Sequence, residues 1–170
     1  MLTSDRPERP AALAERLDDI LVACRRQAKI LVGHDFAPDS ARLGAFAVER
    51  RLPGVDAVRQ QWTDRATKGR GLAKTFDTAH DLGLPGRSDL AAACEHADIE
   101  AATVAEPVSI TTTESLRQAI TRTLAIALVA ARSTGKYGWT RPLDLDQLVT
   151  DAAWDHLARL KDSPPEHTAP

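Results

Sequence analysis

A change in hydrophobic pattern at residue 30 constrains the fold of this chain more than any other feature. From Pro10 onward, apolar residues recur at helical spacing, which predicts a helix with one apolar face. The next residues, Ile30–Gly33, form a short apolar run closed by a glycine, which is typical of a buried strand. A helix followed by a buried strand favours an α/β fold over an all-helical one.

The remaining elements follow from the same rules of periodicity and capping, and they make the predicted fold helix-dominated with a small sheet. In chain order we expect a helix from Asp39 or Ser40 to Leu52, a helical turn over Val55–Trp62, a strand over Ala73–Thr78, a helix capped by Ser88, a helix over Thr113–Arg132, and a last helix over Leu145–Lys161.

The helix over Thr113–Arg132 has the most regular pattern in the chain. Thr111 and Glu114 have the spacing of a capping box, and Gly135 is a natural terminator. Its apolar residues keep strict helical spacing, so we expect them to be buried and Leu124→Asp to destabilise the protein by several kcal/mol. These residues are Leu116, Ile120, Leu124, Leu128 and Ala131.

The overall charge excludes a strongly basic nucleic-acid-binding protein. The chain has 22 Lys and Arg residues against 24 Asp and Glu, for a net charge of −2. Nucleic-acid binding therefore requires a local patch. A glycine-punctuated segment supplies candidate phosphate contacts, although a solvated connection would have the same composition. Trp62 beside this segment is either a base-stacking residue or a core residue, and its helical spacing favours the core. The cations of the segment are Arg65, Lys68, Arg70 and Lys74.

Neither a targeting segment nor a membrane span is evident in the sequence. The longest apolar run, Leu124–Ala131, is far shorter than the roughly 20 residues that a span needs. The N-terminal residues are polar and lack a signal-peptide core. Cys24 and Cys94 lie at apolar helical positions, which favours reduced thiols over a disulfide. We expect a soluble, cytoplasmic protein of bacterial type, with no membrane partner.

The strand over Ile30–Gly33 leads into the most informative stretch of the sequence. Gly33-His34 ends the strand, and Asp39 follows at the expected start of the next helix. In α/β sheets, sites form at the carboxyl ends of strands, where a carboxylate can bind a divalent cation. The simpler alternative, which chemistry alone favours, is that Asp39 caps the helix and contributes about 1 kcal/mol to its stability.

Three segments together resemble the DnaQ-like, DEDD-type 3′–5′ exonucleases, which have a ribonuclease-H-like fold. Val32-Gly-His-Asp-Phe-Ala-Pro-Asp39 resembles the second motif, in which a strand ends in Gly-His-Asn and a metal-binding Asp follows. Phe76-Asp77-Thr78 resembles the family's next strand, and Ser88–Ile99 resembles its next helix. The resemblance covers roughly residues 11–99. It implies an incomplete ribonuclease-H-like sheet, Asp39 as a metal ligand, and Mg²⁺ or Mn²⁺ as cofactor if the protein is active.

The departures from the family pattern concern the other catalytic carboxylates. The Asp-x-Glu of the first motif does not occur before Ile30, and Asp35 replaces the Asn of the second motif. The His-x4-Asp of the last motif is also missing. Asp146 and Asp151 have the same spacing, with Asp146 in the place of the His, which makes Asp151 a candidate catalytic residue beside Asp39. A solvated helix face explains that spacing better. Two-metal hydrolysis needs several carboxylates and a base. We therefore expect a protein that is inactive alone, with a further segment or a partner able to supply the first motif.

The predicted organisation is an exonuclease-like partial domain over residues 1–110, a C-terminal helical pair over 111–161 and a disordered tail over 162–170. The predicted function is that of an exonuclease-like protein that binds single-stranded nucleic acid. One alternative is a helical protein-interaction module without catalysis. Another is an HD-type metal phosphohydrolase, in which His34 and Asp35 would act with His80 and His96. Pairing of Ile30–Gly33 with Lys74–Thr78 as strands would favour the exonuclease-like fold over the helical module.

Overall fold

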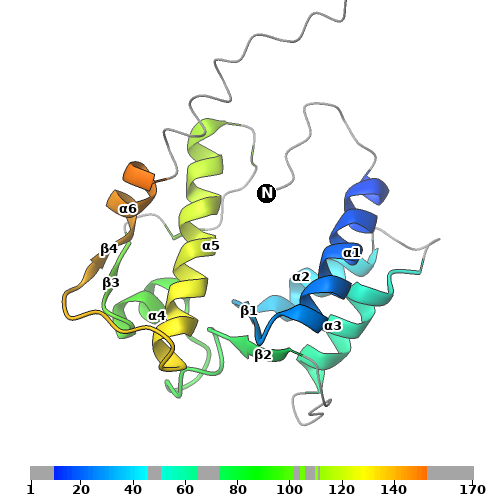
Figure 1. Cartoon of the computed structure of the whole chain (residues 1–170), viewed down its shortest axis with the longest axis horizontal. Helices are drawn as coiled ribbons and strands as arrows, with labels where there is room; N and C mark the ends of the chain where they lie inside the picture. The colour runs from blue at the N-terminus through cyan, green and yellow to red at the C-terminus, as the bar shows by residue number, and fades with distance from the viewer. Residues whose placement is uncertain are drawn as a thin grey trace, which may run out of the picture. The chain divides into compact units, whose positions relative to one another are not determined.

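The protein divides into two compact units, Met1–Gly86 and Arg87–Pro170. The structure, a computed structural model, describes residues 10–45, 51–64, 73–101, 104–105, 110 and 112–152. Each unit combines helices with a two-stranded parallel sheet (Figure 1). The expectation of a helix-dominated α/β fold with small sheets is confirmed.

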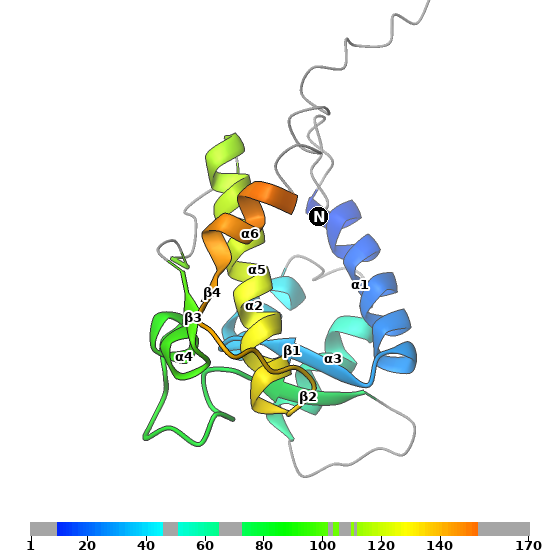
Figure 2. The same ribbon diagram turned by 60° about the vertical axis from the view of Figure 1, so that its left-hand side comes forward.

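The first unit is built around one parallel strand pair. Its elements are α1 (Pro10–Gln27), β1 (Ile30–Gly33), α2 (Phe36–Ala45), α3 (Pro53–Thr63) and β2 (Lys74–Asp77). Ile30 pairs with Lys74 and Gly33 with Asp77, so both strands run in the same direction (Figure 2). Parallel strands need a crossover connection, and α2 and α3 lie within it along the chain. The pairing expected for these two strands is therefore confirmed.

The core of the first unit lies where α1 meets α3. Ala14, Leu52 and Val55 are buried there, and Leu21 and Leu43 pack against them. The two helices approach closely at Gly54, where a Cβ atom would collide with the backbone carbonyl oxygen of Asp18. Glycine at this position therefore allows the contact between α1 and α3.

The start of α2 differs from the expectation. The helix begins at Phe36, three residues before the Asp39 start that local capping rules predict. Asp39 consequently lies within the first turn and does not cap the helix. The expected helical turn at Val55–Trp62 extends to the full α3, which begins at Pro53. Proline suits the first turn of a helix because its missing N–H would have no intrahelical partner there.

The second unit contains a second parallel strand pair, which the sequence patterns do not reveal. Its elements are α4 (Leu90–His96), β3 (Ile99–Glu100), α5 (Thr113–Ser133), β4 (Leu143–Asp144) and α6 (Leu145–Ala152). Ile99 pairs with Leu143 across β3 and β4. Because β3 follows α4 directly, this pairing joins α4 to the C-terminal helices. The units therefore divide at Gly86, earlier than the predicted boundary at residue 110.

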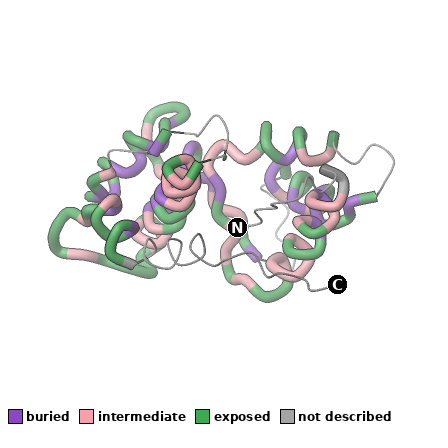
Figure 3. Tube along the Cα trace, turned by 90° about the horizontal axis from the view of Figure 1, so that it is seen from above, coloured by how far each residue is buried: buried purple, intermediate pink, exposed green. Residues whose placement is uncertain are grey.

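The buried face of α5 is shifted by one residue from the predicted leucine stripe. Thr121, Ala125 and Val129 are buried, whereas Leu124 is 39% exposed. Figure 3 shows buried positions in purple alternating with exposed positions along the helices. The capping box is shifted in the same direction, because Thr112 caps the helix and pairs with Ser115. The expectation that Leu124 is buried is wrong, since the small side chains form the packed face of α5.

The described part of α6 ends at Ala152, so the predicted remainder of this helix to Lys161 and the tail over 162–170 lie outside the described residues. Both cysteines are free thiols, in agreement with the favoured reading of the sequence. Cys94 is buried, and desolvation raises its thiol pKa to about 11. Among the described residues, no helix combines the length and apolar character that crossing a bilayer would require.

Candidate functional site

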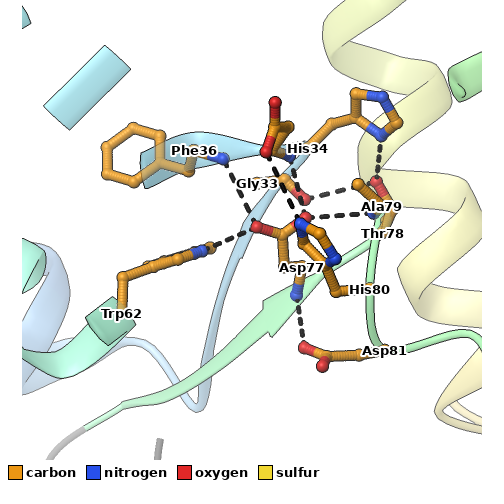
Figure 4. Close-up of polar contacts among 10 residues, drawn as sticks. Gly33, His34, Phe36, Trp62, Asp77, Thr78, Ala79, His80 and Asp81 are labelled. Carbon is orange, nitrogen blue, oxygen red and sulfur yellow. Dashed lines mark hydrogen bonds and ion pairs between the residues drawn. The ribbon is translucent and has the colours of Figure 1, made fainter. Parts of the chain in front are cut away.

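Polar residues of the first unit gather where β1 and β2 end. Because the strands are parallel and in register, His34 and Asp35 at the end of β1 lie beside Asp77 and Thr78 at the end of β2 (Figure 4). The backbone N–H of Thr78 donates to the carbonyl oxygen of Gly33 at 2.9 Å and extends the ladder beyond β2. The segments that resemble two exonuclease motifs are thus adjacent at one sheet edge, which is the usual position of a ligand site in α/β proteins.

The side chain of Asp77 organises this edge. It is 2% exposed, and its carboxylate accepts four N–H groups. Oδ1 accepts the backbone N–H of Asp35 at 2.8 Å and that of Ala79 at 3.0 Å. Oδ2 accepts the Trp62 indole N–H at 2.8 Å and the backbone N–H of Phe36 at 3.3 Å. One carboxylate therefore holds the end of β1, the start of α2 and the last residues of α3.

These hydrogen bonds set the charge state of Asp77. Burial alone raises the pKa of this carboxyl group, but the hydrogen bonds from Trp62, Asp35, Ala79 and Phe36 outweigh burial and leave the pKa below its usual value of 3.8. Asp77 is consequently an anion at neutral pH. Its negative charge occupies the amino end of α2, the place where a helix attracts an anion. A phosphate group at this helix end would have to compete with the protein's own carboxylate.

Trp62 and Phe36 pack beside this carboxylate. Their ring centroids are 4.9 Å apart, and Trp62 is 5% exposed. A Cβ atom at Gly33 would come within 2.9 Å of the Phe36 Cβ and 3.0 Å of the Trp62 ring, so a larger residue would displace both rings. Trp62 is therefore a core residue whose indole N–H fixes Asp77. Its burial argues against the alternative that it stacks on a base.

Two histidines lie at the rim of the same edge. His34 Nδ1 is 3.0 Å from the Thr78 hydroxyl, which in turn donates to the Gly33 carbonyl oxygen at 3.2 Å. A hydroxyl has one proton, so in this arrangement the His34 ring is the donor. His80 Nε2 lies 3.5 Å from Asp35 Oδ1, and their side chains are 39% and 22% exposed. The rim thus carries two imidazole groups, each of which uses one ring nitrogen in a contact within the protein.

The candidate catalytic residues Asp39 and Asp151 belong to different units. The Asp39 side chain is 51% exposed and forms an ion pair with Arg42 at 3.5 Å. Asp151, near the end of α6, accepts a hydrogen bond from Gln147 at 2.8 Å on the exposed face of that helix. Each aspartate has the setting of a solvated helical carboxylate.

The candidate nucleic-acid residues are placed only in part. Lys74 is exposed at the amino end of β2, three residues before Asp77 and thus about 10 Å along the strand from the polar edge. Arg65, Lys68 and Arg70 lie outside the described residues. Since a chain enters and leaves a strand at opposite ends, Lys74 does not share the edge that carries His34 and Asp77.

The residues present do not fit the Mg²⁺ or Mn²⁺ ions that the exonuclease resemblance implies. A two-metal site needs several carboxylates around ions about 4 Å apart. Asp77 has both oxygens occupied by N–H donors, and Asp39 pairs with Arg42. In the part of the chain that the structure describes, no three His, Cys, Asp or Glu side chains are grouped to bind one metal. The same finding gives no support to an HD-type metal centre built on His34 and Asp35.

Sequence reasoning identified the strand ends but not the contacts that organise them. The bond between Trp62 and Asp77 joins residues 15 positions apart and has no local signature. The approach of His80 to Asp35 likewise depends on strand pairing. One signal for it existed, because two parallel strands that each end in an Asp and a His bring those residues to one edge. The HD-type hypothesis grouped His80 with His34 and Asp35, and it also included His96, which lies in the second unit.

Comparisons with protein-family models, with curated proteins and with solved structures found no match to this chain.

Proposed function

We propose that this chain is an exonuclease-like protein that binds single-stranded nucleic acid and does not hydrolyse it alone. The observation that carries the proposal is the in-register parallel pairing of β1 with β2, which joins two motif-like segments in the order that the exonuclease resemblance implies. The chain lacks most of the catalytic carboxylates but has the sheet edge where β1 and β2 end, and this combination favours binding over hydrolysis.

The role of Asp77 supports the absence of catalysis by the chain alone. This carboxylate stabilises the turn from β1 into α2, with its charge balanced by N–H groups. The exposed Asp39 is the remaining motif carboxylate in the first unit, and a single aspartate cannot bind two cations. The histidines at the rim do not replace the missing carboxylates.

A nuclease assay tests the catalytic half of the proposal. The purified chain is incubated with labelled single-stranded DNA and RNA in the presence of Mg²⁺ or Mn²⁺, and release of nucleotides is measured. Asp39→Asn is compared with Asp56→Asn. Asp56 is a matched control because it also lies in the first turn of a helix, pairs with an arginine three residues on and is 55% exposed. We expect negligible release from all three proteins.

Strong metal-dependent release from the 3′ end, lost in Asp39→Asn and retained in Asp56→Asn, would contradict the proposal. That pattern would assign a metal-binding role to Asp39, which simple removal of an exposed charge would not produce.

Fluorescence anisotropy with labelled oligonucleotides tests the binding half. We expect weak binding that decreases as salt is added. Lys68→Ala with Arg70→Ala should weaken binding equally for all sequences, since phosphate contacts do not read bases. Arg16→Ala with Arg59→Ala removes the same charge from the exposed sides of α1 and α3 and serves as the control. Undetectable binding by the parent protein at low salt would refute this half.

A second candidate function is a helical protein-interaction module, favoured by large apolar side chains exposed in the second unit. Leu124 on α5 and Leu148 on α6 are 39% and 42% exposed, although both helices contribute to the core. If this function is correct, Leu124→Asp leaves the protein folded but abolishes binding of a protein partner. A folded Leu124→Asp variant that still binds the partner would argue against this function.

A further inference from the structure

The connection between α5 and β4 in the second unit is held at its start and near its middle. It covers residues 134–142, between helix and strand in Figure 1. At its start, the backbone N–H of Lys136 donates to the Ala131 carbonyl oxygen at 2.9 Å. Farther along, Arg132 donates to the Trp139 carbonyl oxygen at 2.8 Å and lies 4.9 Å from the centre of the Trp139 ring. These contacts hold the middle of the connection against the end of α5.

The Trp139 side chain also attaches the connection to the segment before β3. Its indole N–H lies 3.1 Å from the carbonyl oxygens of both Ala97 and Asp98. Arg132 in turn forms an ion pair with Asp98. The connection is therefore an anchored loop whose backbone is positioned by several hydrogen bonds.

Three large, exposed side chains of this loop suit a binding role. Tyr137, the single tyrosine of the chain, is 72% exposed, and Lys136 and Arg141 are exposed on either side of it in sequence. Within the described residues, none of these three side chains has a hydrogen bond or ion pair. By contrast, the cations Arg42, Arg59, Arg117 and Arg132 pair with carboxylates. The loop also contains no Asp or Glu from Ser133 to Pro142, although the chain as a whole is slightly acidic.

We propose that this loop, through the exposed ring of Tyr137, is a stacking surface for single-stranded nucleic acid. An unstacked base can cover the exposed tyrosine ring, and Lys136 and Arg141 can contact the phosphates on either side. Lys136 and Arg141 are five residues apart in sequence, so their backbones lie at most about 18 Å from each other, within the length of a short oligonucleotide. The proposal deepens the proposed function by naming a surface in the second unit.

A partner with exposed bases fits these residues better than an acidic protein does. Two cations alone would suit either partner, but the large aromatic ring of Tyr137, a residue that is 72% exposed, adds a stacking contact that is tolerant of sequence. Duplex DNA hides its base faces, so we expect the loop to prefer single strands. Binding should therefore depend on the ring of Tyr137 and not on its hydroxyl group.

The test measures anisotropy of labelled oligo-deoxythymidine and oligo-uridine with the full chain. Tyr137→Ala should weaken binding about tenfold or more, in line with the loss of one stacked base. Tyr137→Phe should bind like the parent, because the ring is kept. Lys136→Gln with Arg141→Gln should lower the slope of log K against log salt by about 1.4, which corresponds to two phosphate contacts on a single strand. Circular dichroism checks that each variant is folded.

The outcomes distinguish this inference from the proposed function. Binding that is lost in Lys68→Ala with Arg70→Ala but unchanged in Tyr137→Ala would overturn the loop and keep the proposed function. Equal loss in Tyr137→Ala and Tyr137→Phe would also overturn the stacking role. No binding of any oligonucleotide by the parent would overturn both, and binding of poly-glutamate in place of oligonucleotides would assign the loop to an acidic protein partner.

Discussion

Helices in the two units begin in different ways. In the first unit, α2 and α3 are capped by aspartates from distant elements: Asp77 of β2 accepts the Phe36 N–H, and Asp18 of α1 accepts the Val55 N–H at 2.8 Å. In the second unit, the caps are local. Asp89, Thr112 and Asp144 accept N–H groups three residues ahead, at the starts of α4, α5 and α6.

The difference determines whether the start of a helix is stabilised by its own residues or only by the folded unit. A local cap stabilises its helix whether or not the rest of the unit is folded, whereas a distant cap is present only when the unit is assembled. The distant caps are also buried: Asp77 is 2% and Asp18 is 6% exposed. We therefore expect the first unit to depend on a few buried carboxylates and the second unit on apolar packing with modest contributions from its caps.

Replacing Asp77 should have the largest effect. Asp77→Ala leaves four N–H donors without this acceptor, including the buried indole of Trp62, and we expect a loss of about 3–5 kcal/mol. Hydrogen–deuterium exchange should show the loss in the amides of β1 and β2, with the second-unit amides as an internal control. Asp77→Asn keeps an acceptor and should be milder. Unchanged protection of the β1 amides in Asp77→Ala would show that the first unit does not depend on this distant cap.

Acid should remove part of the same stabilisation. The folded-state pKa of Asp77 is lowered, because its hydrogen bonds outweigh the effect of burial. Its contribution is therefore complete above the unfolded-state pKa of about 4 and decreases as the pH falls toward the folded-state pKa. Exchange measured from pH 7 to pH 3 and corrected for intrinsic rates should show the first unit weakening below about pH 4. Asp77→Asn should flatten this dependence.

Asp18 should give the next effect. Asp18→Ala leaves the buried N–H of Val55 without its partner at the start of α3, and we expect a loss of about 2 kcal/mol. Asp19→Ala is the matched control, because Asp19 is the exposed neighbour on α1. Urea denaturation of both variants measures the difference. Equal midpoints for the two variants would show that the distant cap at α3 contributes little.

The local caps of the second unit should contribute less. Asp89→Ala and Asp144→Ala should each cost about 1 kcal/mol, and replacement by Asn should restore most of it, because Asn also caps helices well. The same exchange experiment reads out α4 and α6 separately. A loss as large as that of Asp77→Ala would show that local and distant caps are equivalent in this protein.

The smallest effect is expected on the exposed side of α5. Leu124→Asp should change the free energy of unfolding by only about 0.5 kcal/mol, since Leu124 is 39% exposed. Ala125→Asp places the same charge at a position with 0% exposure and should destabilise the second unit severely. Thermal denaturation of this adjacent pair tests which face of α5 is packed. A large loss in Leu124→Asp would restore the leucine stripe as the buried face.

The sequence alone determined the local features of the chain. The run Ile30–Gly33 could be identified as a strand because a short apolar run differs from helical periodicity, and the segment around Phe76 was expected to form a second strand. The long helix α5 was also evident, since its pattern repeats over many turns. These signals lie within the segments themselves, so they can be read without knowledge of the fold. The strand ends that carry His34 and Asp77 were identified for the same reason.

The tertiary structure decided the features that depend on contacts between distant segments. The start of α2 was misplaced because its cap, Asp77, lies 41 residues farther along the chain. The buried face of α5 depends on which neighbours pack against it, and the short pair β3 and β4 exists through pairing of residues 99–100 with 143–144. The use of Asp77 as a buried structural anion also depends on Trp62 reaching it from α3. Hydrogen bonding and burial are properties of assembled partners, so no pattern within a single segment could specify them.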